Sequence, residues 1–180
     1  MRPFVRNAIV AAVMAGGGSL GVYQAVNPIF EGREHKAYLD IIGIPTICEG
    51  WTHGVKLGDT ATDAECDKYS EQSYHDAKRI FDKWVPENVR SQMNSVTEAS
   101  FLLFITNVGS GGKGIKDGFV WLKNGRHSSM LRYLQAGNID AARNSACDEF
   151  RKWANAGGKP VRGLQIRRVD ETDMCRWPDD

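Results

Sequence analysis

The chain opens with a long stretch of uncharged residues. Between Arg6 and Glu31 there is no Lys, Arg, Asp or Glu, and residues 7–26 are dominated by Ala, Gly and Val. A helix of this length can cross a bilayer, because a span needs about 20 consecutive apolar residues. Ala and Gly bury little apolar area, however, so insertion would be weak. The pattern predicts an N-terminal apolar helix that holds a membrane only loosely.

Three interpretations of this stretch remain open at this point: a cleaved signal peptide, a permanent anchor, and a weak anchor that enters the membrane and later leaves it intact. Arg2 and Arg6 precede the stretch, and positive flanks stay on the cytoplasmic side of a membrane. All three interpretations place the rest of the chain outside the cytoplasm. The weak anchor is favoured, and it divides the chain into an anchor segment, 1–27, and a folded domain, 28–180.

Beyond the anchor, apolar positions recur mainly at helical spacing. Residues 62–65 form a capping-box pattern, and the apolar positions behind them predict one amphipathic helix over 63–84. A second capping-box candidate, Ser95–Glu98, precedes a strongly apolar helix that we expect to be buried on most sides. Further helices are predicted from Ser128 to Gln135 with a stop at Gly137, from Asn138 to about Gly157, and from about Pro160 to Arg176.

Two regions break the helical pattern. A short β segment is expected from Tyr38 to about Gly54, where isoleucines, among them Ile41 and Ile42, are interrupted by turn residues. Residues 109–126 are rich in Gly and Lys without periodicity, which predicts a loop with one short helical turn at 120–122. The expected fold class is therefore α+β, mainly α, with one small sheet near the front.

Composition limits the function more than the fold. The chain has 180 residues, enough for one compact domain. Its 23 Lys and Arg against 22 Asp and Glu give a net charge of +1, so bulk charge does not indicate a nucleic-acid partner. The four histidines lack the spacing of metal ligands, and no glycine motif that could cradle a phosphate follows the apolar segment. Neither a metal nor a cofactor is expected.

Three residues form the candidate chemistry. Glu31 ends the apolar segment, and Asp40 and Thr46 fall in the β segment that follows. A carboxyl at a helix edge beside a carboxylate on a hairpin can hydrolyse a glycosidic bond: one acid protonates the leaving oxygen, and the other group activates water or stabilises an oxocarbenium-like centre. On spacing alone, solvated surface carboxylates remain the alternative.

The sequence segments around these residues resemble those of the phage-type lysozymes, glycoside hydrolase family 24. Glu31, eight residues, Asp40, five residues and then Thr46 match the catalytic pattern of that family. The resemblance continues in order to about Trp177. The matching segments are Tyr38-Leu39-Asp40, Pro45-Thr46-Ile47-Cys48, Phe104-Ile105-Thr106-Asn107-Val108-Gly109, Trp153-Ala154-Asn155 and Gly163-Leu164-Gln165-Ile166-Arg167-Arg168.

The resemblance implies a lysozyme-like fold, with a small front hairpin and a helical lobe, that cuts the β-1,4 bond between N-acetylmuramic acid and N-acetylglucosamine with inversion. Glu31 would be the general acid, Asp40 the second carboxylate, and Thr46 the residue that helps to place the attacking water. Asn107 and Gly109 would contact the substrate. A lytic transglycosylase and a non-catalytic wall-binding protein remain as alternatives.

The N-terminal segment resembles that of signal-arrest-release endolysins, which lyse the bacterial host of a phage. This resemblance implies that residues 7–26 tether the enzyme, inactive, to the periplasmic face of the inner membrane, and that release delivers it to the periplasm. The implied partners are peptidoglycan, that membrane and, indirectly, a holin or pinholin. The released enzyme is expected to be a monomer.

The sequence also departs from the family pattern. Gly50-Trp51-Thr52 stands where relatives often carry Gly-His-Thr, and the 112–126 stretch is longer than usual. This insertion is predicted to be either a tolerated surface loop or an added cleft wall that uses Lys113, Lys116 or Trp121. The resemblance implies that Arg162 or Arg167 orients Glu31. The sequence does not choose between them, and a solvated helix face is the alternative.

Four cysteines allow three pairings, and the extracytoplasmic location permits disulfides. Proximity in the chain and in the expected fold favours the pairs Cys48–Cys66 and Cys147–Cys175. Free buried thiols remain the alternative. The N-terminal segment contains no cysteine, so thiol exchange with the anchor is excluded.

Overall fold

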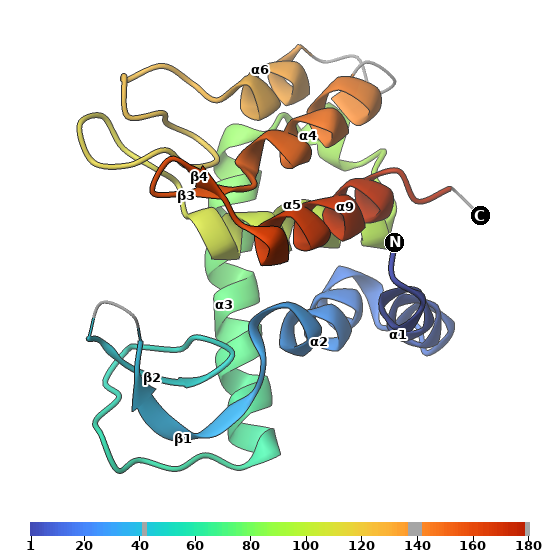
Figure 1. Ribbon diagram of the computed structural model, residues 1–180. Helices are drawn as coiled ribbons and strands as arrows, with labels where there is room; N and C mark the ends of the chain where they lie inside the picture. Colours follow the sequence, from blue (N-terminus) through green and yellow to red (C-terminus); the bar gives the residue numbers. More distant parts are fainter. Residues whose placement is uncertain (41–42, 137–141, 179–180) are drawn as a thin grey trace.

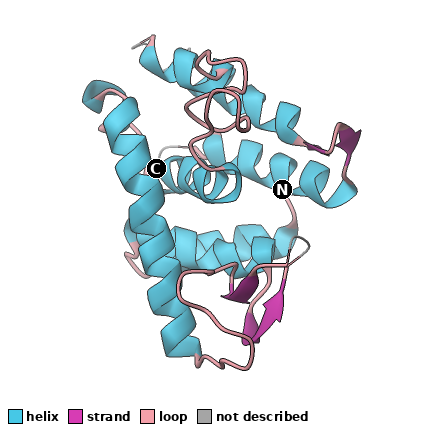
Figure 2. Ribbon diagram, turned by 90° about the vertical axis from the view of Figure 1, so that its left-hand side faces the viewer, coloured by secondary structure: helices cyan, strands magenta, loops and turns pink. Residues whose placement is uncertain are grey.

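Two lobes of unequal size share one long helix (Figure 1). The computed structural model describes residues 1–40, 43–136 and 142–178. Helix α3 (Asp63–Trp84) runs from a small lobe, which contains a two-stranded hairpin, into a larger helical lobe. Helices dominate the structure, and the two small sheets are both antiparallel (Figure 2). The predicted fold class, mainly α with a small front sheet, is confirmed.

The uncharged N-terminal stretch forms two helices rather than the single helix that its pattern predicts. These are α1 (Pro3–Met14) and α2 (Gly18–Glu31), which lie side by side. Gly16, between them, and Gly18, the first residue of α2, have φ angles of 70° and 56°. Glycine adopts this left-handed conformation readily because it has no Cβ. The glycines therefore let the chain turn back between two apolar helices.

Both N-terminal helices pack into the main core. Arg2, just before α1, donates to Asp170 on α9 (Arg162–Cys175) at 2.5 Å. Within the residues that the structure describes, none of the helices combines the length and the apolar content that a membrane crossing requires. The division of the chain at 27/28 stays a prediction. The fully buried apolar side chains of the two helices are Val5, Ile9, Val22, Tyr23 and Val26.

The front sheet begins and ends earlier than the predicted β segment. Strand β1 (Glu34–Leu39) pairs antiparallel with β2 (Pro45–Cys48), and Tyr38 lies opposite Thr46. Ile41 and Ile42 lie outside the described residues. Residues 49–61 form loops with isolated bridges to the hairpin, because this lobe has only a small core to organise longer strands. That core consists of Ala37, Ile47, Cys48 and Cys66.

The central helices follow the predicted pattern more closely. Helix α3 has the predicted bounds, and the Thr62–Glu65 capping box is confirmed. Helix α5 (Ser95–Val108) is buried along most of its length, as predicted. Its cap is different, because the Asn94 side chain accepts from the first backbone N–H groups, so the capping box at Ser95–Glu98 is wrong. A short helix that the pattern did not predict, α4, covers Glu87–Arg90.

The C-terminal region is less regular than predicted. Helix α6 (Ser129–Gln135) begins after its predicted cap, Ser128. The predicted stop at Gly137 and cap at Asn138 lie outside the described residues. Pro160 lies in a strand instead of opening the last helix, and residues 120–122 form no helical turn. The remaining elements are a π-helical turn η1 (Ala142–Ala146), α8 (Cys147–Glu149), a 3-10 turn η2 (Phe150–Trp153), β3 (Asn155–Ala156) and β4 (Lys159–Pro160).

Both favoured disulfide pairings are confirmed. The Cys48–Cys66 bond joins β2 to the first turn of α3, and the Cys147–Cys175 bond joins α8 to the end of α9. All four cysteines are buried, so each bond lies within a core and not across a surface loop. Each lobe is therefore closed by one covalent link.

Candidate active site

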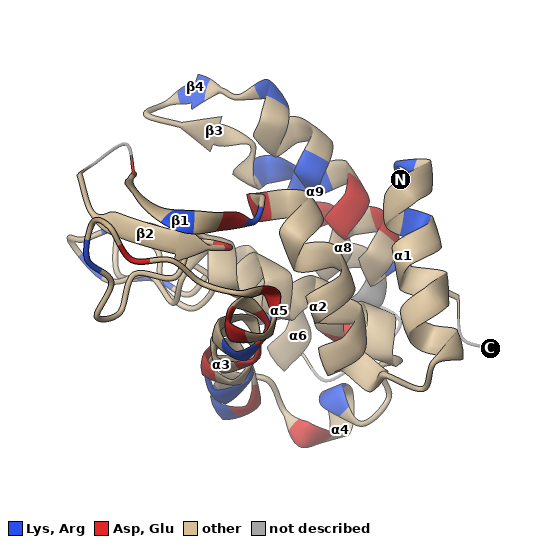
Figure 3. Cartoon of the chain, turned by 90° about the horizontal axis from the view of Figure 1, so that it is seen from below, with Lys and Arg blue, Asp and Glu red and all other residues tan. Residues whose placement is uncertain are grey.

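Glu31 is the last residue of α2 and projects from its tip. Gly32, with a φ of 78°, ends the helix, and its backbone N–H donates to Pro28 O at 3.0 Å. The Glu31 side chain is 25% exposed, so its carboxyl is partly screened yet open to a ligand. Figure 3 shows basic positions of α9 beside the junction of α2 and β1. The sequence reaches this geometry by ending an apolar helix at a glutamate followed by glycine.

Arg167 on α9 orients this carboxyl, which decides between the two arginines that the sequence left open. Its Nη1 donates to Glu31 Oε1 at 2.5 Å, its Nε donates to Glu171 Oε1 at 2.8 Å, and its Nη2 donates to the Leu103 carbonyl at 3.2 Å. The Arg167 side chain is 6% exposed. Burial opposes its charge, but Glu171 and Glu31 outweigh burial and raise the pKa of Arg167. Arg167 therefore remains a fixed cation behind Glu31.

Asn107, near the end of α5, is the second contact of Glu31. Its Nδ2 donates to Glu31 Oε1 at 3.5 Å, and its Oδ1 accepts from Arg168 Nη2 at 2.5 Å. Arg168 also pairs with Glu171, which is fully buried between the two arginines. The amide is thus oriented by the same buried network that holds Arg167. The structure brings together two predicted site residues, Glu31 and Asn107.

Sequence reasoning missed the roles of Arg168 and Glu171. Glu171 follows Arg167 by four positions and Arg168 by three, which is the spacing of neighbouring side chains on a helix. That spacing was the available signal. It does not reveal that this face of α9 is buried, which depends on tertiary packing.

Gly109 ends α5 and has a clear structural role. Its φ is 73°, its N–H donates to Ile105 O at 2.7 Å, and its carbonyl accepts from Phe119 N at 2.9 Å. A Cβ at this position would lie 3.4 Å from Lys116 Nζ. The glycine therefore allows the turn into the 109–126 loop. Its contact with substrate stays a prediction.

Asp40 and Thr46 are fixed to the same end of the hairpin. The Asp40 carboxylate accepts from Ile44 N at 2.8 Å. The Thr46 hydroxyl donates to Ile44 O at 2.9 Å, and Thr46 is only 3% exposed. Both side chains are therefore ordered around Ile44, and β1 connects this end of the hairpin to Glu31.

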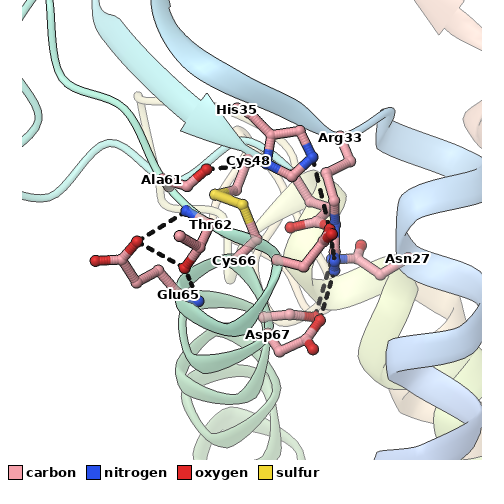
Figure 4. The surroundings of a disulfide bond; sticks show 12 residues. Asn27, Arg33, His35, Cys48, Ala61, Thr62, Glu65, Cys66 and Asp67 are labelled. Atoms are coloured by element: carbon pink, nitrogen blue, oxygen red, sulfur yellow. Dashed lines mark hydrogen bonds and ion pairs between the residues drawn. A yellow bond between two sulfur atoms is a disulfide. The ribbon is translucent and has the colours of Figure 1, made fainter.

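Arg33 anchors the link between Glu31 and β1, and no sequence pattern singled it out. Its guanidinium donates to Asp63 at 3.0 Å and to Asp67 at 2.7 Å, both on α3, and also to the buried Glu49. Figure 4 shows Arg33 beside Asp67 and the Cys48–Cys66 disulfide. Three carboxylates on one guanidinium, two residues after Glu31, fix the start of β1 against α3.

The disulfide also explains a cluster with metal-ligand spacing. Cys48, Glu49 and Cys66 have ligand atoms within 4.8 Å of one another. Their two sulfur atoms are bonded to each other, so neither is a thiolate that could bind a metal. In the described part of the chain, this cluster is the one found with such spacing.

Two cavities meet at Asn107, and a third reaches the preceding residue, Thr106. One of about 290 Å³ is lined by Glu31, Asn107 and Arg167. A larger one of about 790 Å³ also reaches Asn107 and extends past Trp153. A third of about 230 Å³ reaches Thr106. A polymeric substrate could therefore lie against Glu31 and extend in more than one direction.

The architecture defines a glycoside hydrolase of the lysozyme type, and comparison with known proteins gives the family. The profile of the phage lysozyme family matches residues 28–171. The chain is 32% identical to the SAR-endolysin of Enterobacteria phage PA-2, over 98% of each chain. It is 30% identical to the SAR-endolysin of Bacteriophage PS119, over 98% of this chain and 97% of the relative. The chain therefore belongs to the phage lysozyme family.

A solved structure supports the fold. The active form of the P1 phage endolysin Lyz superposes with a TM-score of 0.70, covering 95% of this chain and 92% of that one at 22% identity. The protein is a lysozyme-type glycoside hydrolase, a phage endolysin with muramidase activity.

Proposed function

We propose that Glu31 is the general acid with which this endolysin cuts the β-1,4 bond between N-acetylmuramic acid and N-acetylglucosamine. The proposal rests on the surroundings of Glu31. Its partly exposed carboxyl lies at a helix tip, accepts a hydrogen bond of 2.5 Å from the buried Arg167, and lines a cavity. Such support fixes the direction in which a proton can be delivered. In the reaction, Glu31 protonates the oxygen of the leaving sugar.

Asp40 and Thr46 act on the opposite side of the sugar ring. Asp40 is the second carboxylate, which stabilises positive charge at the anomeric carbon or activates water. The Thr46 hydroxyl gives its proton to Ile44 O, so its oxygen can accept a hydrogen bond from the attacking water. These roles predict inversion at the anomeric carbon, which NMR of the freshly formed product would detect.

Asn107 and Gly109 contribute to substrate binding. The side-chain oxygen of Asn107 accepts a hydrogen bond from Arg168, so the amide nitrogen is the atom that faces Glu31 and a bound sugar. Gly109 leaves room at the entrance of the loop that lines the neighbouring cavity. These contacts would hold an acetamido or hydroxyl group next to the cleaved bond.

The N-terminal segment regulates access to this site. Residues 7–26 carry no charge, and only four residues separate them from Glu31. While that segment spans the inner membrane, Glu31 lies at the lipid surface, where a glycan polymer cannot reach it. In the structure the same segment forms most of α1 and α2 and contributes apolar side chains to the main core. A membrane-held, inactive form and a released, active form are thus two packings of one apolar segment.

Release follows loss of the membrane potential, for which a holin or pinholin is the indirect partner. The released enzyme acts as a monomer in the periplasm on peptidoglycan. The relatives from phages PA-2 and PS119 are named SAR-endolysins, which supports this order of events.

Mass spectrometry of muropeptides tests the reaction type. Hydrolysis leaves a reducing muramic end, and we expect that product. An anhydro end would instead identify a lytic transglycosylase, and binding without any released fragment would identify a wall-binding protein. Either result would overturn the proposal.

A further inference from the structure

We propose that the loop over residues 109–127 adds a saccharide-binding subsite, formed by Trp121 and Trp84, at a distance from Glu31. The subsite would bind another N-acetylhexosamine unit of the strand that is cut. The inference rests on the proposed function, because the ligand is taken to be the same glycan. It gives the insertion the role of a cleft wall rather than that of a tolerated surface loop.

Backbone contacts join the start of the loop to residues 118–121. A Cβ at Gly111 would lie 2.0 Å from Trp121 O and 2.5 Å from Gly118 N, so only glycine fits this backbone crossing. Gly118 N donates to Trp121 O, and Trp121 N donates to Ser110 O, both at 2.9 Å. The backbone of Trp121 is thereby held from two sides, and its indole packs on His127 and Trp84.

Two indole rings from separate elements meet here. Trp121 stacks on His127 with 4.1 Å between ring centroids, and its centroid lies 5.6 Å from that of Trp84 at an interplanar angle of 84°. Trp84 is the last residue of α3. Both indoles are half-buried, so part of each stays accessible. Loop and helix thus supply two aromatic surfaces at one place.

The rings line an open cavity of about 670 Å³ that adjoins a second cavity. This cavity shares Asp76 and Ile80 with the cavity of about 230 Å³ that reaches Thr106. Thr106 precedes Asn107, whose amide donates to Glu31. The cavity beside Trp121 therefore adjoins one that ends a single residue before Asn107.

The chemistry of the lining fits a neutral sugar. Aromatic faces pack against the C–H face of a pyranose, while nearby polar groups satisfy its hydroxyl groups. Ser110 and Lys83 provide such groups, and Arg79 is paired with Asp76 at 2.6 Å. The Arg79–Asp76 pair contributes no net charge, and Lys83 leaves one cation in the lining. A pyranose ring, which combines an apolar face with hydroxyl groups, matches this surface.

Binding measurements in a Glu31→Gln background test the subsite without cleavage of the probe. The probes are a short and a long soluble N-acetylglucosamine oligosaccharide, followed by the NMR signals of the indole N–H groups. We expect the long probe to bind more tightly than the short one. The long probe should shift the Trp121 indole N–H signal, and the short probe should leave that signal unchanged. Trp121→Ala should weaken binding of the long probe by about tenfold, and Trp121→Phe should restore part of it.

Tyr133→Ala is the matched control, because it removes an exposed aromatic ring from α6 and should leave the affinity for the long probe unchanged. Equal affinities for Trp121→Ala and Tyr133→Ala, or a Trp121 signal that does not respond to the long probe, would overturn the proposal. The indole signal decides the matter even if Trp121→Ala fails to fold. Failure of the proposed function would appear separately, as wild-type protein that releases no muropeptides.

Discussion

At the scale of single residues, Glu31 depends on side chains that come from distant parts of the chain. Arg167 follows it by 136 positions, and Asn107 by 76. A guanidinium presents several donors in one plane, which lets Arg167 bond to Glu31, Glu171 and a backbone carbonyl together. A single point charge could not make all three contacts.

Arg167→Lys should therefore lower kcat by about tenfold to a hundredfold, with a smaller effect on KM, because a displaced acid loses its alignment with the leaving oxygen. Clearing rates on isolated cell walls at several substrate concentrations would separate the two constants. Arg176→Lys is the control, since Arg176 forms an exposed pair with Asp148 and should retain wild-type kcat. Wild-type kcat in Arg167→Lys would show that Arg167 does not position Glu31.

Tyr23 illustrates how α2 is fixed to α5. Its hydroxyl lies 2.9 Å from Thr106 Oγ1, and the Thr106 hydroxyl itself donates to Leu102 O, so Tyr23 is the donor. Burial raises the pKa of Tyr23 above its ordinary value, which keeps the phenol protonated. The hydrogen bond is thus available over the whole working pH range.

Tyr23→Phe should lower the free energy of unfolding by about 1 kcal/mol, because one buried hydrogen bond is lost. Urea denaturation would measure the change. Tyr38→Phe, at an exposed position, should leave stability unaltered. If both variants unfold alike, the Tyr23–Thr106 contact contributes nothing to holding α2.

At the scale of elements, patterning predicted those parts whose signals are local. Helix α3 carries its own cap and its own apolar stripe, and its predicted bounds agree with the structure. The break within 7–26 was missed, because an apolar pattern is the same for one membrane span and for two packed helices. The cap of α5 was missed for a related reason: Asn94 and Ser95 both have capping side chains, and tertiary packing decides between them.

Gly18→Leu should shift the enzyme toward the membrane. A left-handed φ costs a leucine about 1–2 kcal/mol, so the turn between α1 and α2 is penalised relative to one continuous apolar helix. We expect the membrane-bound share to rise by about fivefold to tenfold in fractionated cells.

Gly21→Leu is the matched control for this change. It adds the same apolar side chain to α2 at a position without positive φ and with open space around the new Cβ. The two variants should therefore differ in membrane retention. Equal retention would mean that hydrophobicity alone, and not the turn, governs release.

At the scale of the whole molecule, the two lobes depend differently on their disulfides. The core of the small lobe has four buried residues, and two of them are Cys48 and Cys66. The Cys147–Cys175 bond lies in the much larger main core. The small lobe therefore has little apolar packing to replace its covalent link.

The double variant Cys48→Ala with Cys66→Ala should lose about 3 kcal/mol of stability, with faster hydrogen exchange confined to the small lobe. The double variant Cys147→Ala with Cys175→Ala should affect the helical lobe instead. Hydrogen exchange followed by mass spectrometry would compare the two. Identical exchange patterns would contradict the assignment of one bond to each lobe.

The site as a whole was predictable only in part. The resemblance to the phage-type lysozymes, carried by the spacing of Glu31, Asp40 and Thr46, identified two candidate acids and a threonine. The same resemblance suggested Arg162 or Arg167 as the residue that orients Glu31. The contacts of Arg33 with Glu49, Asp63 and Asp67 bring together three separate elements, and no local pattern encodes such a contact. Residues that support a site from a distance are selected by tertiary structure.

The most direct test of the central claim is the hydrolysis rate of Glu31→Gln on peptidoglycan, measured beside its thermal unfolding. Removing the acid while keeping its shape should lower the rate by about a hundredfold to ten-thousandfold and leave a folded protein. A folded Glu31→Gln protein that cuts peptidoglycan at the wild-type rate would show that the carboxyl held by Arg167 is not the group that delivers the proton.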